Sequence, residues 1–152
     1  MRALRQVIRP HFTSALLAGV VITVSASPAS AATCSVSTAG VAYGSYDTLA
    51  STPLDGVGAI NVSCDASTSF AVALSSGNGS FAQRLMTAGT SQLGYNLYTD
   101  ATRTIVWGDG ISGSTVSATG TAVDLSIYGR IPAQQNVTAG VYSDTITITV
   151  SY

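Results

Sequence analysis

Apolar and polar residues alternate along most of the chain after residue 33. The alternation is clearest at the end of the last segment, which starts at Tyr142: positions 145, 147, 149 and 151 are threonine or serine, and they alternate with Ile146, Ile148, Val150 and Tyr152. A period of two is typical of a β-strand with one buried face. Because no window shows the spacing of an amphipathic helix, the pattern predicts an all-β domain.

The same alternation predicts earlier strands. They cover 34 to about 46, 60–64, 70–74 after a short polar turn, 93–97, 105–107 and 123–131. We expect 93–97 and 105–107 to form a hairpin, and 123–131 to pair antiparallel with the last strand. Short strands separated by glycine, serine and asparagine turns favour an immunoglobulin-type β-sandwich. Alternation alone does not distinguish a sandwich from a barrel.

The first 31 residues have the order of a secretory signal peptide. Arginines at positions 2, 5 and 9 precede an apolar stretch at 15–24 and a small-residue run at 25–32, which predicts cleavage after Ala31, with Ala26 and Ala32 as alternative sites. The apolar stretch of about ten residues is short for a membrane span, although an uncleaved anchor is the alternative. We therefore expect one exported domain, residues 32–152, without membrane insertion after cleavage.

Charge and histidine content exclude several functions. The exported part keeps three arginines and seven aspartates, a net charge of about −4, and has neither lysine nor glutamate. Such a surface offers no electrostatic footprint for nucleic acid. The only histidine, His11, lies in the signal peptide, so no histidine-based catalytic or metal site is expected. The aspartates are typical turn formers, and we expect no enzyme and no cofactor.

Cys34 and Cys64 are the only cysteines, and both lie in the exported part. In an oxidising compartment we expect them to form a disulfide, the alternative being a buried pair of free thiols. Closing a loop of about 31 residues stabilises a fold by roughly 3.5 to 4 kcal/mol in the loop-closure model. The bond would join the start of the first strand to the end of the second.

Trp107 is a candidate ligand contact because it precedes the turn Gly108-Asp109-Gly110, where an indole could stack on a sugar. The alternative is a core tryptophan beside a turn. A calcium site shared by Asp100 and Asp109 lacks the ligand ladder of a calcium loop. We therefore expect no metal site.

Six short sequences carry a family resemblance. They are Tyr43-Gly44-Ser45-Tyr46-Asp47, Ile60-Asn61-Val62-Ser63-Cys64, the stretch 93–100, Val106-Trp107-Gly108-Asp109-Gly110, Tyr128-Gly129-Arg130-Ile131-Pro132 and Gly140-Val141-Tyr142-Ser143-Asp144. In this order they make the exported chain resemble the spore coat protein U domain family. The resemblance implies a subunit of an archaic chaperone-usher assembly, which builds surface pili or a spore coat.

The resemblance also implies an incomplete immunoglobulin fold that lacks its last strand. A periplasmic chaperone would lend the missing strand, and a sibling subunit would replace it after passage through the outer-membrane usher to the cell surface. The uncovered edge of the last strand fits this role, so we assign strand acceptance to Ile146, Ile148, Val150 and Tyr152. The alternative is that the first strand or a loop closes this edge internally.

The resemblance is weakest before Cys34. The family resemblance implies a donor segment of ten or more residues with alternating apolar positions there, whereas cleavage after Ala31 leaves only Ala32 and Thr33. We therefore expect a terminal or capping subunit that accepts a strand without donating one. A fibre-tip adhesin or carbohydrate-binding module, with Trp107 and tyrosines as contacts, is the alternative function.

Overall fold

The computed structural model describes residues 32–152, and the signal-peptide prediction lies outside them. Within this range the chain forms strands only, which confirms the predicted all-β class, and no helix there is long and apolar enough to cross a membrane. The six strands are β1 (Cys34–Val41), β2 (Leu54–Leu74), β3 (Arg84–Ala88), β4 (Ser91–Tyr98), β5 (Val116–Ile131) and β6 (Ile148–Ser151).

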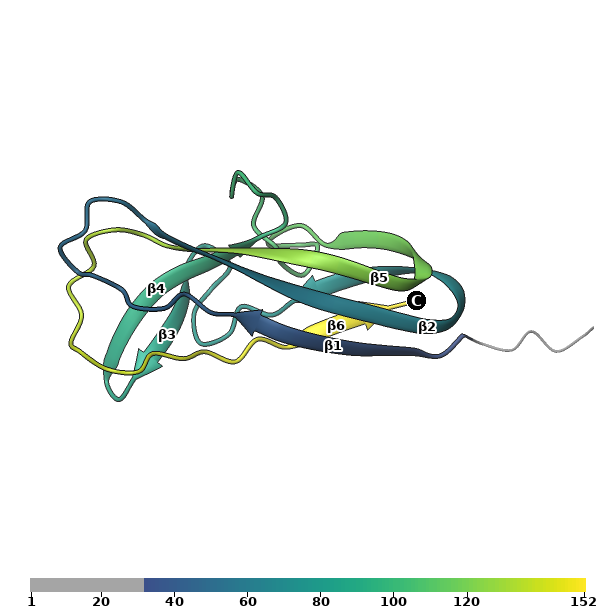
Figure 1. Cartoon of the computed structure of the whole chain (residues 1–152), viewed down its shortest axis with the longest axis horizontal. Helices are drawn as coiled ribbons and strands as arrows, with labels where there is room; N and C mark the ends of the chain where they lie inside the picture. The colour runs from purple at the N-terminus through teal and green to yellow at the C-terminus, as the bar shows by residue number, and fades with distance from the viewer. Residues whose placement is uncertain (1–31) are drawn as a thin grey trace, which may run out of the picture. The chain divides into compact units, whose positions relative to one another are not determined.

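The strands form one antiparallel sheet that curls over. Its order is β1-β2-β5-β4-β3, and β6 pairs with β2. β5 pairs with one edge of β2 on both sides of the register shift in β2. β1 and β6 therefore both pair with the opposite edge of β2. Figure 1 shows β2 and β5 bending back at one end of the domain, so that β1 and β6 run alongside each other. No strand pairing joins β1 to β6 in the described chain, and the sheet is open there.

The short polar segment between the predicted strands 60–64 and 70–74 was expected to be a turn, and this prediction is wrong. Residues 54–74 form one continuous strand, and the pairing of β2 with β5 shifts register between Ser63 and Thr68. Extra residues on one strand of a pair bend it and increase its twist. The polar segment therefore bends the β2–β5 ribbon.

The end of the chain also differs from expectation. Regular pairing begins only at Ile148, and β6 pairs with residues 71–74 of β2 instead of with 123–131. The expected hairpin is reduced to an isolated bridge between Tyr98 and Val106, and β3, which was not expected, pairs with β4. The first strand ends at Val41, before Tyr46. These differences reflect pairing partners, which alternation does not specify.

The disulfide between Cys34 and Cys64 is confirmed. The two cysteines are direct partners across β1 and β2, so the bond holds β1 to its neighbour. Because β2 continues to Leu74, Cys64 lies within the strand and not at its end.

The core lies between the two halves of the curled sheet and contains one buried cation. Arg84, at the start of β3, is 0% exposed. Its guanidinium donates to the backbone oxygens of Ser75 (2.8 Å) and Trp107 (2.7 Å) and to the side-chain oxygen of Asn96. Burial lowers the pKa of Arg84 from its usual value. No ion pair to Arg84 is found among the described residues. The positive charge of its guanidinium is therefore stabilised by these three neutral oxygens.

Candidate functional site

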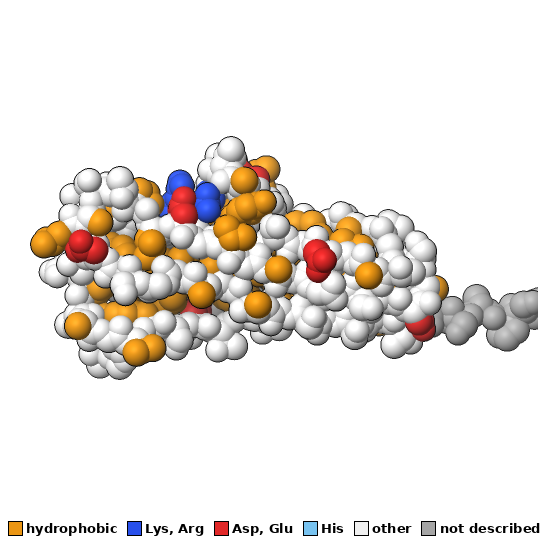
Figure 2. All heavy atoms as spheres, viewed as in Figure 1, with side chains coloured by type: hydrophobic (Ala, Val, Ile, Leu, Met, Phe, Trp, Pro, Cys, Tyr) orange, Lys and Arg blue, Asp and Glu red, His pale blue; other side chains and the backbone are white. Residues whose placement is uncertain are grey.

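A groove of about 940 Å³ follows the seam between the first and last strands. One wall is the end of β1 with the segment after it, residues 38–48, and the other wall is the segment leading into β6, residues 137–148. Figure 2 shows apolar side chains gathered in this hollow, toward the left of the view. The floor is formed by buried apolar side chains of four strands, namely Leu74, Met86, Leu93, Tyr95, Leu97, Ile127 and Ile131.

The seam wall formed by the last segment has an unpaired backbone edge. The carbonyl oxygens of Ser143 and Thr147 accept bonds from the amides of Thr87 and Ser75, on the side away from the groove. Because successive backbone groups of an extended chain point to opposite edges, those of Ile146 and Ile148 point into the seam.

The opposite wall has the same arrangement. The carbonyl oxygen of Thr33 accepts a bond from the amide of Asp65 on the β2 side, so the amides of Cys34 and Val36 point into the seam. The groove therefore combines an apolar floor with two backbone edges that an extended segment could pair with.

The groove side chains on the last segment are only half-buried. Ile146 and Ile148 line the groove, while their β2 neighbour Leu74 is fully buried. On β1, Val36 is 42% exposed although its partner Val62 is 0% exposed. These apolar side chains face inward, but the described chain covers them only in part.

The other two predicted acceptor residues lie beyond the groove. Val150 packs against the core but does not line the groove. Tyr152 is 60% exposed, and its hydroxyl accepts a bond of 3.4 Å from the amide of Cys34. The four residues follow one another along the last segment, and only the first two face the groove.

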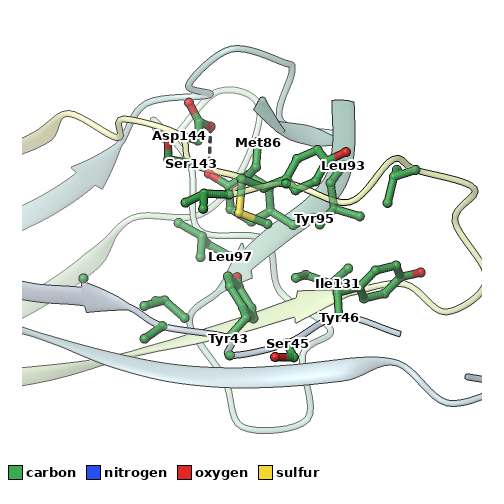
Figure 3. A pocket seen from close by; sticks show the side chains of 18 of the residues that line it. Tyr43, Ser45, Tyr46, Met86, Leu93, Tyr95, Leu97, Ile131, Ser143 and Asp144 are labelled. Atoms are coloured by element: carbon green, nitrogen blue, oxygen red, sulfur yellow. Dashed lines mark hydrogen bonds between the residues drawn. The ribbon is translucent and has the colours of Figure 1, made fainter. Parts of the chain in front are cut away.

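Half-buried Tyr43 and buried Tyr95 line the groove, and neither was assigned to the acceptor site from the sequence. Tyr43 and Tyr95 contact edge to face, with ring centroids 6.1 Å apart. Figure 3 shows Tyr43 on one side of the groove and Tyr95 on the other. A Cβ at Gly129 would collide with the Tyr43 hydroxyl, so a larger residue there would displace the Tyr43 ring. Burial raises the pKa of both tyrosines above the usual value, which keeps their hydroxyls protonated.

Asp144 fixes the last segment to the floor. Its carboxylate accepts a bond of 2.8 Å from the Tyr95 hydroxyl, drawn in Figure 3, and another from the amide of Asn78. The bond to Asp144 adds to the raised pKa of Tyr95. The signal available in the sequence was the motif around Tyr142-Ser143-Asp144, which alternation did not connect to β4.

Trp107 is not a surface contact, and this prediction is wrong. Its side chain is 0% exposed, and its indole N–H donates to the backbone oxygen of Val72 at 2.9 Å. An indole enclosed in this way has no free face for a sugar. Trp107 is a core tryptophan beside a turn, as in the alternative interpretation. The carbohydrate-binding hypothesis therefore loses Trp107 as a contact residue.

The sequence model of the Spore Coat Protein U domain matches residues 20–149, most of the chain. The chain belongs to the Spore Coat Protein U domain family. The match of the Spore Coat Protein U domain begins inside the predicted signal peptide. Among residues 32–152 of this chain, no three histidine, cysteine, aspartate or glutamate side chains lie close enough together to hold a metal ion.

Two individual proteins are similar to this Spore Coat Protein U domain. Protein U of Myxococcus xanthus is 39% identical over 66 residues, which are 43% of this chain and 37% of that protein. The second is a chain from the crystal structure of the CsuC-CsuE chaperone-tip adhesion subunit pre-assembly complex, from the archaic chaperone-usher Csu pili of Acinetobacter baumannii. It shares 21% identity and a TM-score of 0.52 over 80% of this chain and 40% of that chain. The likeness shows an immunoglobulin-like fold and confirms the predicted fold class.

Proposed function

We propose that this protein is a structural subunit of a chaperone-usher surface fibre or spore coat, and that its groove accepts a donated β-strand. The observation that carries the proposal is the groove itself, in which an apolar floor lies between two inward-facing backbone edges. β-strand addition uses these features, since backbone hydrogen bonds give affinity and side-chain pockets give specificity. Membership of the Spore Coat Protein U domain family supports the same role.

The partners follow from this proposal. A periplasmic chaperone would fill the groove first and a sibling subunit later, with an outer-membrane usher between them, and the protein would be exported through the periplasm to the cell surface. The pre-assembly complex in which the similar fold was solved contains a chaperone and a tip subunit, which supports chaperone binding by this fold.

Capture by a chaperone tests the proposal. We expect the subunit expressed alone to be recovered in a yield roughly tenfold lower than with a co-expressed chaperone, because half-buried Ile146 and Ile148 leave it marginally stable and prone to edge pairing. Equal recovery of a stable monomer without any partner would contradict strand acceptance.

We further propose that the subunit ends or caps a fibre. This rests on predicted cleavage after Ala31, which leaves Ala32 and Thr33 before Cys34. N-terminal sequencing of the exported protein should find a start at about residue 32. A start before about residue 20 would restore a donor segment, and the capping proposal would then be abandoned.

A further inference from the structure

Two tyrosine hydroxyls form hydrogen-bonded closures, one near each end of the groove. At one end, the Tyr46 hydroxyl donates to the backbone oxygen of Pro132 at 2.9 Å and accepts from the amide of Gln135 at 2.7 Å. At the other end, the Tyr152 hydroxyl accepts from the amide of Cys34 at 3.4 Å. The groove is the slot between these two bonds, and the second bond lies beyond its end, since neither Cys34 nor Tyr152 lines it.

The two closures differ in strength. Tyr46 makes two short bonds, and its ring packs against the core. Tyr152 makes one long bond, and its ring is 60% exposed. Hydrogen bonds weaken as they lengthen toward 3.5 Å, and exposed ones are replaced by water at little cost. Tyr152 is therefore the closure that can open.

The bond of Tyr152 occupies a specific backbone position. Thr33 bonds to β2, so Cys34 is the first residue of β1 whose amide faces the seam, followed by Val36 and Thr38. A donated strand that pairs along β1 from the groove outward reaches Thr38 and Val36 before Cys34. It meets the Tyr152 hydroxyl already bound at the Cys34 amide.

We propose that Tyr152 is a stop that limits how far a donated strand pairs along β1, an inference that rests on strand acceptance by the groove. A short strand fills the slot without disturbing Tyr152. A longer strand gains the Cys34 position only when the Tyr152 side chain moves aside. Tyr152 thereby sets the length of partner strand that the subunit binds in full register.

Two peptides of different length test the stop. Both alternate valine and threonine, with a lysine at each end for solubility, and they have about seven and about eleven residues, at roughly 3.3 Å per residue. Their affinities are measured by titration against the wild-type protein, Tyr152→Ala and the control Tyr128→Ala. Tyr128 lies on β5 and does not line the groove.

We expect the shorter peptide to bind all three proteins equally. The longer peptide should bind Tyr152→Ala roughly two- to threefold more tightly than the wild type or Tyr128→Ala, because it no longer has to displace the long, exposed hydrogen bond of Tyr152. Equal binding of the shorter peptide also shows that Tyr152→Ala is folded.

The remaining outcomes separate the inference from the proposed function. If both peptides bind but the longer one gains nothing from Tyr152→Ala, the stop is overturned and the acceptor groove stands. If neither peptide binds any of the three proteins, the acceptor groove fails and the stop fails with it.

Discussion

Replacing Ile148 by aspartate should abolish capture of the subunit by its chaperone without affecting export. Ile148 lines the groove next to the apolar floor and is half-buried before any strand is added. A donated strand would enclose the new carboxylate among apolar side chains with no cation beside it, which costs several kcal/mol. We therefore expect affinity for the chaperone to fall by a factor of roughly 100 or more. The measurement is co-purification of the subunit with a tagged chaperone.

The matched control is Thr149→Asp. Thr149 is the next residue of β6, and its side chain is exposed on the opposite face. The same charge placed there should leave capture within about twofold of the wild type, because it stays in water. Recovery of Ile148→Asp with the chaperone at the wild-type level would show that the groove is assigned to the wrong surface.

Arg84→Met should destabilise the domain by about 3 to 5 kcal/mol. The guanidinium is fully buried and holds the backbone oxygens of Ser75 and Trp107 together with the side chain of Asn96. Methionine has a similar volume but no donor, so the backbone oxygens of Ser75 and Trp107 lose this partner, while the Asn96 side-chain oxygen keeps its bond from the amide of Leu97. Each buried group left without a partner costs about 1 to 3 kcal/mol. Urea unfolding of the purified domain, followed by emission of the single tryptophan Trp107, measures the change.

Arg130→Met is the control for Arg84→Met. The Arg130 side chain pairs with Asp55 at 2.7 Å, and both side chains are about one-third exposed. An ion pair that exposed contributes about 0 to 1 kcal/mol, so this variant should unfold close to the wild type. A similar loss in the free energy of unfolding in the two variants would contradict the stabilising role given to the hydrogen bonds of Arg84.

Much of the fold could be predicted from the sequence because alternation records which side chains are buried. Along residues 142–150 every even position is half-buried and every odd position is exposed, as the pattern predicted. The pattern does not record partners, so the pairing of β6 with β2 was missed. The pattern also predicted a turn where β2 only bends, because the polar residues between 64 and 70 have the composition of a turn.

The groove could be predicted only in part. Ile146 and Ile148 were identified because they belong to the most regular alternating segment, and both line the groove. The opposite wall around Tyr43 and the contact of Tyr95 with Asp144 depend on residues far apart in the sequence. Arg84 was missed for a related reason, since a lone arginine is usually exposed and its burial depends on acceptors from distant loops.

Hydrogen exchange of the seam amides tests the central claim most directly. The amides of Val36, Ile146 and Ile148 face the seam between β1 and the last segment without a partner strand, so they should exchange readily in the free subunit. In the complex with the chaperone they should exchange at least about tenfold more slowly, because a donated strand would bond to them. Unchanged exchange at all three amides, with new protection elsewhere on the domain, would contradict strand acceptance in this groove.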